Sequence, residues 1–184
     1  MTGHDPELEE MFELLYSITP ELFHSEIVGG AICMVPKRNV HSVIVTSVFR
    51  QLMRCSGPGA EVVYDVRLDL PGWRNAFAPD VYKLSAGARP DARGEWRYQD
   101  VEFVLEVITR GTAENDYGKK KDAYAAGEIP VYLIADPYTG ECQVHTDPRD
   151  GAYQHVRTVP FGEKVDLTDT VVGMTLETDR FPRD

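Results

Sequence analysis

Acidic side chains at three separate places in the chain, together with one lysine, have the chemical types that metal-assisted chemistry requires. Glu26, Asp80 and Glu106 each lie among apolar or strand-forming neighbours. Two or three carboxylates that meet at one point bind Mg²⁺ or Mn²⁺, because hard cations prefer oxygen ligands. A lysine beside such an ion can orient an attacking water and offset developing negative charge. The fold must therefore bring these acids together, with Lys120 beside them.

Glu106 lies in a stretch, Asp100 to Pro137, that predicts a strand, a helix and a second strand. Residues Val101 to Thr109 form a nearly unbroken apolar run. Such a run is typical of a strand buried on both faces. An unpaired carboxylate in the middle of that strand would cost on the order of several kcal/mol. Glu106 therefore either has a partner or lines a polar cleft.

The helix that follows runs from Thr112, a plausible N-cap, to Ala126, and a glycine occupies the usual C-terminal cap position. Asp116, Lys120 and Tyr124 are spaced four residues apart and share one face of this helix. Lys120 lies about 12 Å along the helix from Thr112, and Glu106 lies about 10 Å along the strand from Thr109. These two lengths match if the helix folds back over the strand. Lys120 then lies nearly level with Glu106, within reach of its carboxylate.

The remaining elements place these residues in an α/β fold. Periodicity and turn residues predict helices over residues 5–16 and 39–53, a hairpin over Ser25–Val35, strands over Glu61–Leu70, Ala76–Leu84 and Ile129–Ala135, and a hairpin from Glu141–Thr146 and Tyr153–Val159. This order predicts a mixed β-sheet core flanked by helices, with an extra N-terminal helix and a C-terminal β-hairpin, in a single domain over residues 1–184. Proline in the strand Ala76–Leu84 implies an edge, a strand start or a bulge, which can turn Asp80 out of the ladder.

The formal net charge of −11 counts against tight DNA binding, because dedicated nucleic-acid binders usually carry a basic surface. The charge is uneven, however. Residues 1–30 hold seven acids and no Lys or Arg, whereas residues 31–60 hold four basic residues and no acid. A local basic face on an acidic protein is therefore compatible with the sequence.

The cysteines and the hydropathy favour a cytoplasmic protein. Cys33, Cys55 and Cys142 are far apart and odd in number, which is typical of a reducing compartment, and each is expected to be a small buried hydrophobe. No run approaches the roughly 18 apolar residues of a membrane span, and the acidic N-terminus has no signal-peptide pattern. We therefore expect no membrane association.

The pattern of these acids resembles the PD-(D/E)XK nuclease superfamily and, more narrowly, the bacterial Uma2 family of restriction-endonuclease-like proteins. The resemblance spans roughly Phe23 to Pro137. The matching segments are Glu26 with the following IVGG, Pro79-Asp80-Val81, Leu105-Glu106-Val107-Ile108, and the stretch from Asp116 to Pro137. In the parent superfamily the lysine lies two residues after the glutamate, where this chain has Ile108. In the Uma2 family its role is assigned to the helix, which fits Lys120.

The resemblance implies a restriction-endonuclease-like fold and metal-dependent hydrolysis of DNA phosphodiesters. Asp80 and Glu106 would hold Mg²⁺ or Mn²⁺, with the carbonyl of Val107 as a further ligand. Glu26 would assist directly or through water, and Lys120 would orient the attacking water. The same resemblance implies a homodimer. An alternative is a nuclease fold with weak or lost catalysis that serves as a binding or scaffolding module.

Simpler roles remain open for each residue in the sequence alone. Asp116 and Lys120 could form an ordinary surface ion pair, Asp80 could be a turn residue, and Glu26 could be solvated. A structural role is favoured for Tyr124, which would pack in the core, and a structural or surface role for His41, in the first turn of a helix. Lys37 and Arg38 are expected to be solvated, and contact with phosphate is the alternative for them. A serine or cysteine hydrolase is disfavoured, because neither residue type lies in a nucleophile motif.

Overall fold

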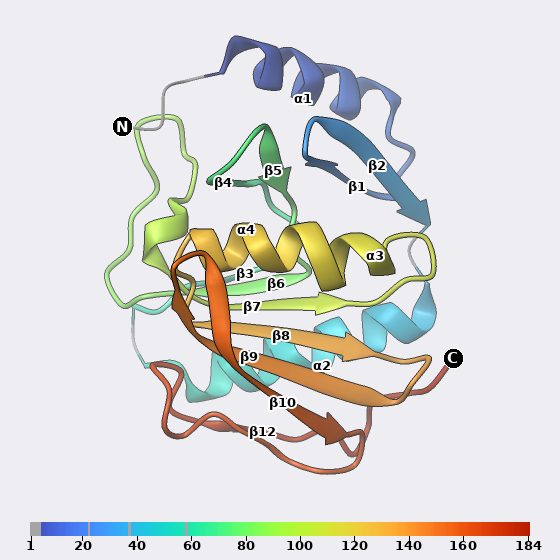
Figure 1. The fold of residues 1–184 in the computed structure, drawn as a ribbon, viewed down its shortest axis with the longest axis vertical. Helices are drawn as coiled ribbons and strands as arrows, with labels where there is room; N and C mark the ends of the chain where they lie inside the picture. The colour runs from blue at the N-terminus through green and yellow to red at the C-terminus, as the bar shows by residue number, and fades with distance from the viewer. Residues whose placement is uncertain (1–4, 22, 37, 58) are drawn as a thin grey trace.

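A smaller β-sheet lies above a larger one in the view of Figure 1. The computed structural model describes residues 5–21, 23–36, 38–57 and 59–184. The smaller sheet is antiparallel with strand order β2-β1-β5-β4, its strands being β1 Phe23–Val28, β2 Ala31–Pro36, β4 Leu68–Leu70 and β5 Asn75–Phe77. The larger sheet has strand order β10-β9-β8-β7-β6-β3, its strands being β3 Val62–Val63, β6 Val81–Leu84, β7 Val101–Val107, β8 Val131–Asp136, β9 Glu141–Arg149 and β10 Ala152–Pro160. The predicted mixed sheet is therefore present, and β7 and β8 form its parallel pair.

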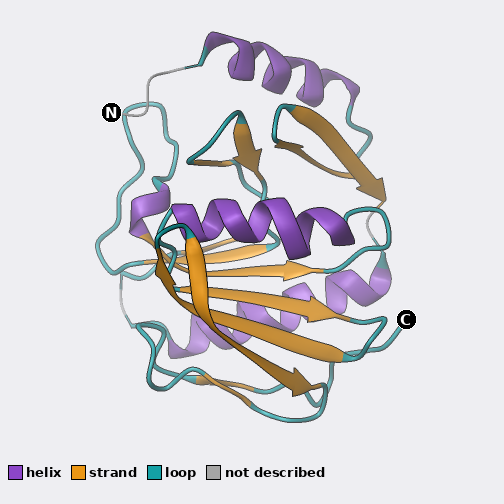
Figure 2. Ribbon diagram, viewed as in Figure 1, coloured by secondary structure: helices purple, strands orange, loops and turns teal. Residues whose placement is uncertain are grey.

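Helices cover both faces of the larger sheet (Figure 2). The helix α2, Asn39–Cys55, buries Ile44, Val48 and Leu52 against one face. The opposite face carries three consecutive helical segments, which are α3 Ala113–Asn115, η2 Asp116–Lys120 and α4 Lys121–Ala126. The core on that side also includes Phe77 from the smaller sheet, so the three segments lie where the two sheets join.

The extra N-terminal helix, α1, Pro6–Ile18, closes the outer side of the smaller sheet (Figure 1). Asp5 caps it, because its carboxylate accepts hydrogen bonds from the first backbone N–H groups. Leu15 and Ile27 of β1 are both buried in the core between helix and sheet. The rigid placement of β1, and of Glu26 on it, therefore depends on α1.

Two predicted strands differ from the structure, and both differences shape the site. The strand expected over Glu61–Leu70 is broken into β3 and β4, because residues 64–67 leave the ladder and Asp65 adopts a φ of 54°. The strand expected over Ala76–Leu84 is divided between the two sheets, as β5 and β6. Pro79 has no N–H to donate to a neighbouring strand, which interrupts the ladder at this point. Its carbonyl accepts a hydrogen bond from the Asp65 N–H, at 2.9 Å.

The C-terminal β-hairpin is confirmed, and β9 and β10 are longer than predicted. The remaining short elements are η1 Tyr98–Asp100, β11 Val165–Asp166 and β12 Thr175–Leu176. Cys142 is buried and Cys33 half-buried, but Cys55 is exposed because it lies at the last turn of α2, beyond the buried Leu52, so the expectation of burial is wrong there. Among the described residues, no helix is long and apolar enough to cross a membrane.

Candidate active site

The ammonium group of Lys120 lies among three carboxylates that come from three different elements. Its Nζ is 2.9 Å from Oε2 of Glu26, 2.8 Å from Oε1 of Glu106 and 3.0 Å from Oδ1 of Asp116. The Lys120 side chain is only 2% exposed. A surface pair of Asp116 and Lys120 is thereby excluded, as is a solvated Glu26, which is 1% exposed. We refer to Glu26, Glu106, Asp116 and Lys120 as the acid–lysine cluster.

The helical segment that carries Lys120 is irregular, which the sequence did not reveal. Residues Asp116–Lys120 form one π-helical turn between two α-helical segments. The carbonyl of Asp116 accepts a hydrogen bond from the Tyr132 hydroxyl, at 2.9 Å. Thr112 is at the N-cap position, but its hydroxyl donates to the Asp116 carboxylate, at 3.1 Å, rather than capping the helix. A π-turn of this kind is common at functional sites.

Glu106 has a second partner that sequence reasoning assigned only to packing. The Tyr124 hydroxyl donates to Oε1 of Glu106, at 2.5 Å, and its ring packs against Phe77 and Tyr132. The one available signal was its spacing, since Tyr124 lies four residues after Lys120 on the same face. Lys120 and Tyr124 together provide the partners that a carboxylate in the middle of β7 needs.

Asp80 lies at the junction of the sheets, immediately before β6. Its Oδ2 accepts the backbone N–H of Val107, at 2.7 Å, and its Oδ1 lies 2.9 Å from Nε2 of His41. The contact with Val107 places Asp80 beside the end of the strand that carries Glu106. The sequence favoured a structural or surface role for His41, because a helix start does not stabilise a protonated imidazole. The sequence did not show that the Asp80 carboxylate lies beside His41 and could stabilise its protonated form.

A second histidine, His24, lies beside Glu26 on β1. Because side chains alternate along a strand, the two residues share a face, and Nε2 of His24 is 3.9 Å from Oε2 of Glu26. Its Nδ1 lies 2.8 Å from Oδ1 of Asp65. Oε1 of Glu26 has no hydrogen-bond partner among the residues that the structure describes, although it is buried. The sequence did not identify His24 as a candidate site residue. Its partner Asp65 lies in the interruption of the strand that was predicted over Glu61–Leu70.

Burial and neighbouring charges set the pKa values in this region. Burial raises the pKa of Glu106 to about 8, and the carboxylates of Asp80, Asp116 and Glu26 add to the shift, while Lys120 opposes it. The raised pKa means that negative charge at Glu106 is only partly compensated by Lys120. A further cation placed beside Glu106 would therefore be stabilised.

Asp80 and Glu26 respond differently, because their cationic neighbours outweigh the effect of burial. Burial alone would raise the pKa of Asp80, but His41 outweighs burial and lowers it. In the same way Lys120 lowers the pKa of Glu26 against the effect of burial. Burial would lower the pKa of Lys120, yet its three carboxylates hold that pKa well above the ordinary value. Lys120 is therefore charged at any physiological pH.

The donor atoms suit a hard divalent cation, whereas their present arrangement does not yet enclose one. Carboxylate oxygens are the ligands that Mg²⁺ and Mn²⁺ prefer, and Oε1 of Glu26 is buried without a partner. Within the described ranges, however, no three His, Cys, Asp or Glu side chains converge on a common metal position. The carboxylates of the acid–lysine cluster meet at the Lys120 ammonium instead.

Of the two basic residues that precede α2, Arg38 is the one that the structure describes. Lys37 lies outside the described residues, and its predicted role stays open. Arg38 is exposed and pairs with Asp184, at 3.2 Å. The structure therefore gives Arg38 a carboxylate partner at the surface.

The two-sheet fold places the chain in a class of α/β proteins that already has a solved member. It matches a crystal structure described as "a putative nuclease belonging to DUF820" from Anabaena variabilis, with a TM-score of 0.72. The match covers 95% of this chain and 96% of that one, at 15% sequence identity, so it establishes similarity of fold. No curated protein matches the chain.

The particular family is given by the sequence itself. The model of the Uma2 family, described as "Putative restriction endonuclease", matches residues 8–179. This chain belongs to the Uma2 family. The predicted family and fold class are both confirmed.

Proposed function

We propose that this protein is a metal-dependent endonuclease that hydrolyses DNA phosphodiester bonds at the acid–lysine cluster and Asp80. Membership of a restriction-endonuclease family and the nuclease-like fold support nuclease activity. The observation that carries the proposal is that the carboxylates of Glu26 and Glu106 both lie within 2.9 Å of the Lys120 ammonium. Glu26 is 80 residues before Glu106 in the chain, and Lys120 is 14 residues after it. Burying such charges is costly, and buried titratable groups with perturbed pKa values cluster at functional sites.

The roles of the residues follow from their positions. Asp80 and Glu106 would hold Mg²⁺ or Mn²⁺, with the carbonyl of Val107 as a further ligand, and Glu26 would assist directly or through water. When bound, the cation would acidify a water and offset charge on the phosphate. Lys120 would orient the attacking water, which requires that its ammonium exchange one of its three carboxylate contacts for that water.

Substrate must reach a site that is nearly closed in this structure. Glu106 and Lys120 are fully buried, whereas Asp80 is 6% exposed and its partner His41 is half-buried at the protein surface. The approach from solvent therefore lies on the side of Asp80 and His41. A small opening there would expose the carboxylates to a phosphodiester without unfolding either sheet.

The test is cleavage of supercoiled plasmid DNA in Mg²⁺, in Mn²⁺ and in EDTA. We expect nicked and linear products with either metal, none in EDTA, and none from Glu106→Gln. The matched control is Glu102→Gln, on the same strand, where the native carboxylate pairs with Lys83. Equal cleavage by wild type and Glu106→Gln, or no cleavage in either metal, would exclude this function.

A second candidate function, a binding or scaffolding module, is favoured by one observation. Every charge in the acid–lysine cluster already has a partner within the protein, and the cluster is buried as a structural ion-pair network would be. The two functions differ in their response to metal. Binding of Mn²⁺ to the folded state should raise the melting temperature of a nuclease, whereas a metal-free scaffold should melt at the same temperature with Mn²⁺ or EDTA.

A further inference from the structure

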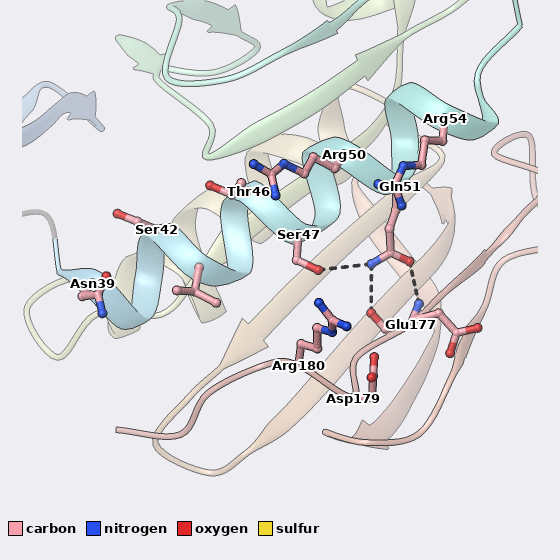
Figure 3. A pocket seen from close by; sticks show the side chains of 11 residues that line it. Asn39, Ser42, Thr46, Ser47, Arg50, Gln51, Arg54, Glu177, Asp179 and Arg180 are labelled. Carbon is pink, nitrogen blue, oxygen red and sulfur yellow. Dashed lines mark hydrogen bonds between the residues drawn. The ribbon is translucent and has the colours of Figure 1, made fainter.

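A groove with a volume of about 790 Å³ runs along the outer face of α2 (Figure 3). One wall is the helix, from Asn39 to Arg54, and the other is the C-terminal segment 177–180. The helix contributes two adjacent rows of polar side chains, opposite the buried row that packs on the sheet. These rows are rich in hydroxyl and amide groups, which are hydrogen-bond donors.

The groove carries unpaired positive charge on a protein of net charge −11. Arg50 and Arg54 project from α2, and Arg180 faces them from the opposite wall (Figure 3). All three side chains are exposed, and none forms an ion pair with any residue that the structure describes. The helix itself contains no acidic residue. Asp179 is the one groove acid without an ion pair among the described residues.

The second wall is held in place by a paired contact with the helix. The side-chain amide of Gln51 donates to the carbonyl of Glu177, at 2.9 Å, and accepts the Glu177 N–H, at 2.8 Å. The Glu177 carboxylate pairs with Lys164, at 2.8 Å. This contact fixes the backbone next to Arg180, so the groove is a formed feature of the fold.

One end of the groove lies at the helix turn that carries His41. The first groove residues, Asn39 and Ser42, flank His41 in the sequence, and His41 contacts Asp80 from the sheet-facing side of the same turn. From His41 to Arg54 the helix extends about 20 Å, at about 1.5 Å per residue. A strand of nucleic acid lying along the helix would therefore lead from Arg54 to the helix turn whose other side contacts Asp80.

We propose that the α2 groove binds the sugar–phosphate backbone of duplex DNA and directs it to Asp80. The inference rests on the proposed nuclease function. Arginine, hydroxyl and amide groups are the usual partners of phosphate oxygens, and they position a duplex without reading its sequence. This local basic surface lets an acidic protein bind DNA, and it places the acid-free helix α2 against the substrate.

The test measures binding without cleavage, by fluorescence anisotropy of a labelled DNA duplex of arbitrary sequence in EDTA. The salt concentration is varied over about 50–200 mM, the range over which binding through phosphate contacts weakens steeply. The slope of log K against log salt is negative, and each lost phosphate contact should reduce its magnitude by about 0.9. Arg50→Gln/Arg54→Gln should therefore lower it by about 1.8 and weaken binding, whereas Asp179→Asn should tighten binding. Arg149→Gln, on the hairpin at the other side of the sheet, is the control and should bind as wild type.

The possible outcomes are distinct from those of the cleavage test. Absence of duplex binding by the wild type, or unchanged binding by the double variant, overturns the proposal even if the protein cleaves DNA. A change of oligomeric state of the double variant in sedimentation overturns it too, because the groove would then be a contact between two copies. Charge-dependent binding without any cleavage in metal leaves the groove intact and removes the proposed nuclease function.

Discussion

Lys120 is the single cation shared by three buried carboxylates, so its loss should destabilise the fold more than loss of one acid. Lys120→Met leaves Glu26, Glu106 and Asp116 without their common partner, and we expect a loss of about 3–5 kcal/mol in the free energy of unfolding. Glu106→Gln should cost much less, because it removes a charge that is poorly compensated. Urea denaturation measures both. Equal losses would contradict this arrangement, and Lys119→Met, at an exposed neighbouring position, is the control.

The raised pKa of Glu106 predicts a specific pH dependence in metal-free buffer. Burial and neighbouring charges shift this pKa from 4.5 to about 8. Its contribution to stability is therefore complete below pH 4.5 and is lost as pH rises through about 8. Glu106→Gln cannot ionise, so its stability relative to wild type should rise across this window, by at most about 1.4 kcal/mol per pH unit. A pH-independent difference in urea denaturation would show that Glu106 ionises normally.

At the scale of residues, the sequence could predict groups whose local surroundings demand a partner. Glu106 in an apolar strand is such a group, and its contact with Lys120 followed from matching lengths of strand and helix. His24 and His41 gave no comparable signal, because their partners Asp65 and Asp80 are 41 and 39 residues away in the chain. Whether any of these residues binds metal or substrate stays a prediction.

The π-helical turn is the element that sets the position of Asp116 relative to Lys120. Deleting Gly118, which lies within the turn, would restore regular α-helical winding and leave Asp116 three residues before Lys120 instead of four, which shifts the carboxylate relative to the ammonium. We expect the variant to lose stability, because the geometry of a buried ion pair is disturbed. Differential scanning calorimetry measures the change, and an unchanged melting temperature would mean that the π-turn is unnecessary.

A matched variant at the same position should have the opposite effect. A Cβ at Gly118 would meet no atom within 4 Å, and the position has no left-handed backbone conformation. Gly118→Ala should therefore stabilise the protein by about 0.5–1 kcal/mol, since glycine in a helix interior is unfavourable.

At the scale of elements, regular periodicity was a reliable guide and breaks in it were not. The helices and the two hairpins follow local patterns, and their positions were predicted. The division of residues 76–84 between two sheets depends on where Phe77 and Val81 pack, which only tertiary structure determines. An alternating pattern over residues 61–70 likewise concealed the left-handed Asp65.

At the scale of the whole molecule, the site depends on the docking of two sheets. Glu26 belongs to the smaller sheet and Glu106 to the larger one. Leu15→Ala in α1 loosens the core behind β1 and should cost about 2–5 kcal/mol. If the smaller sheet opens first, plasmid cleavage by this variant will be lost at lower urea than the circular dichroism signal. Coincident loss of both signals would instead show that the two sheets unfold together.

The division of the acids between the sheets also bears on when activity can first arise. A newly made chain that has assembled only the larger sheet carries Glu106 and Lys120 but lacks a positioned Glu26. In the proposed nuclease, such an incomplete molecule would lack the assistance of Glu26, so full activity would begin only once both sheets have assembled.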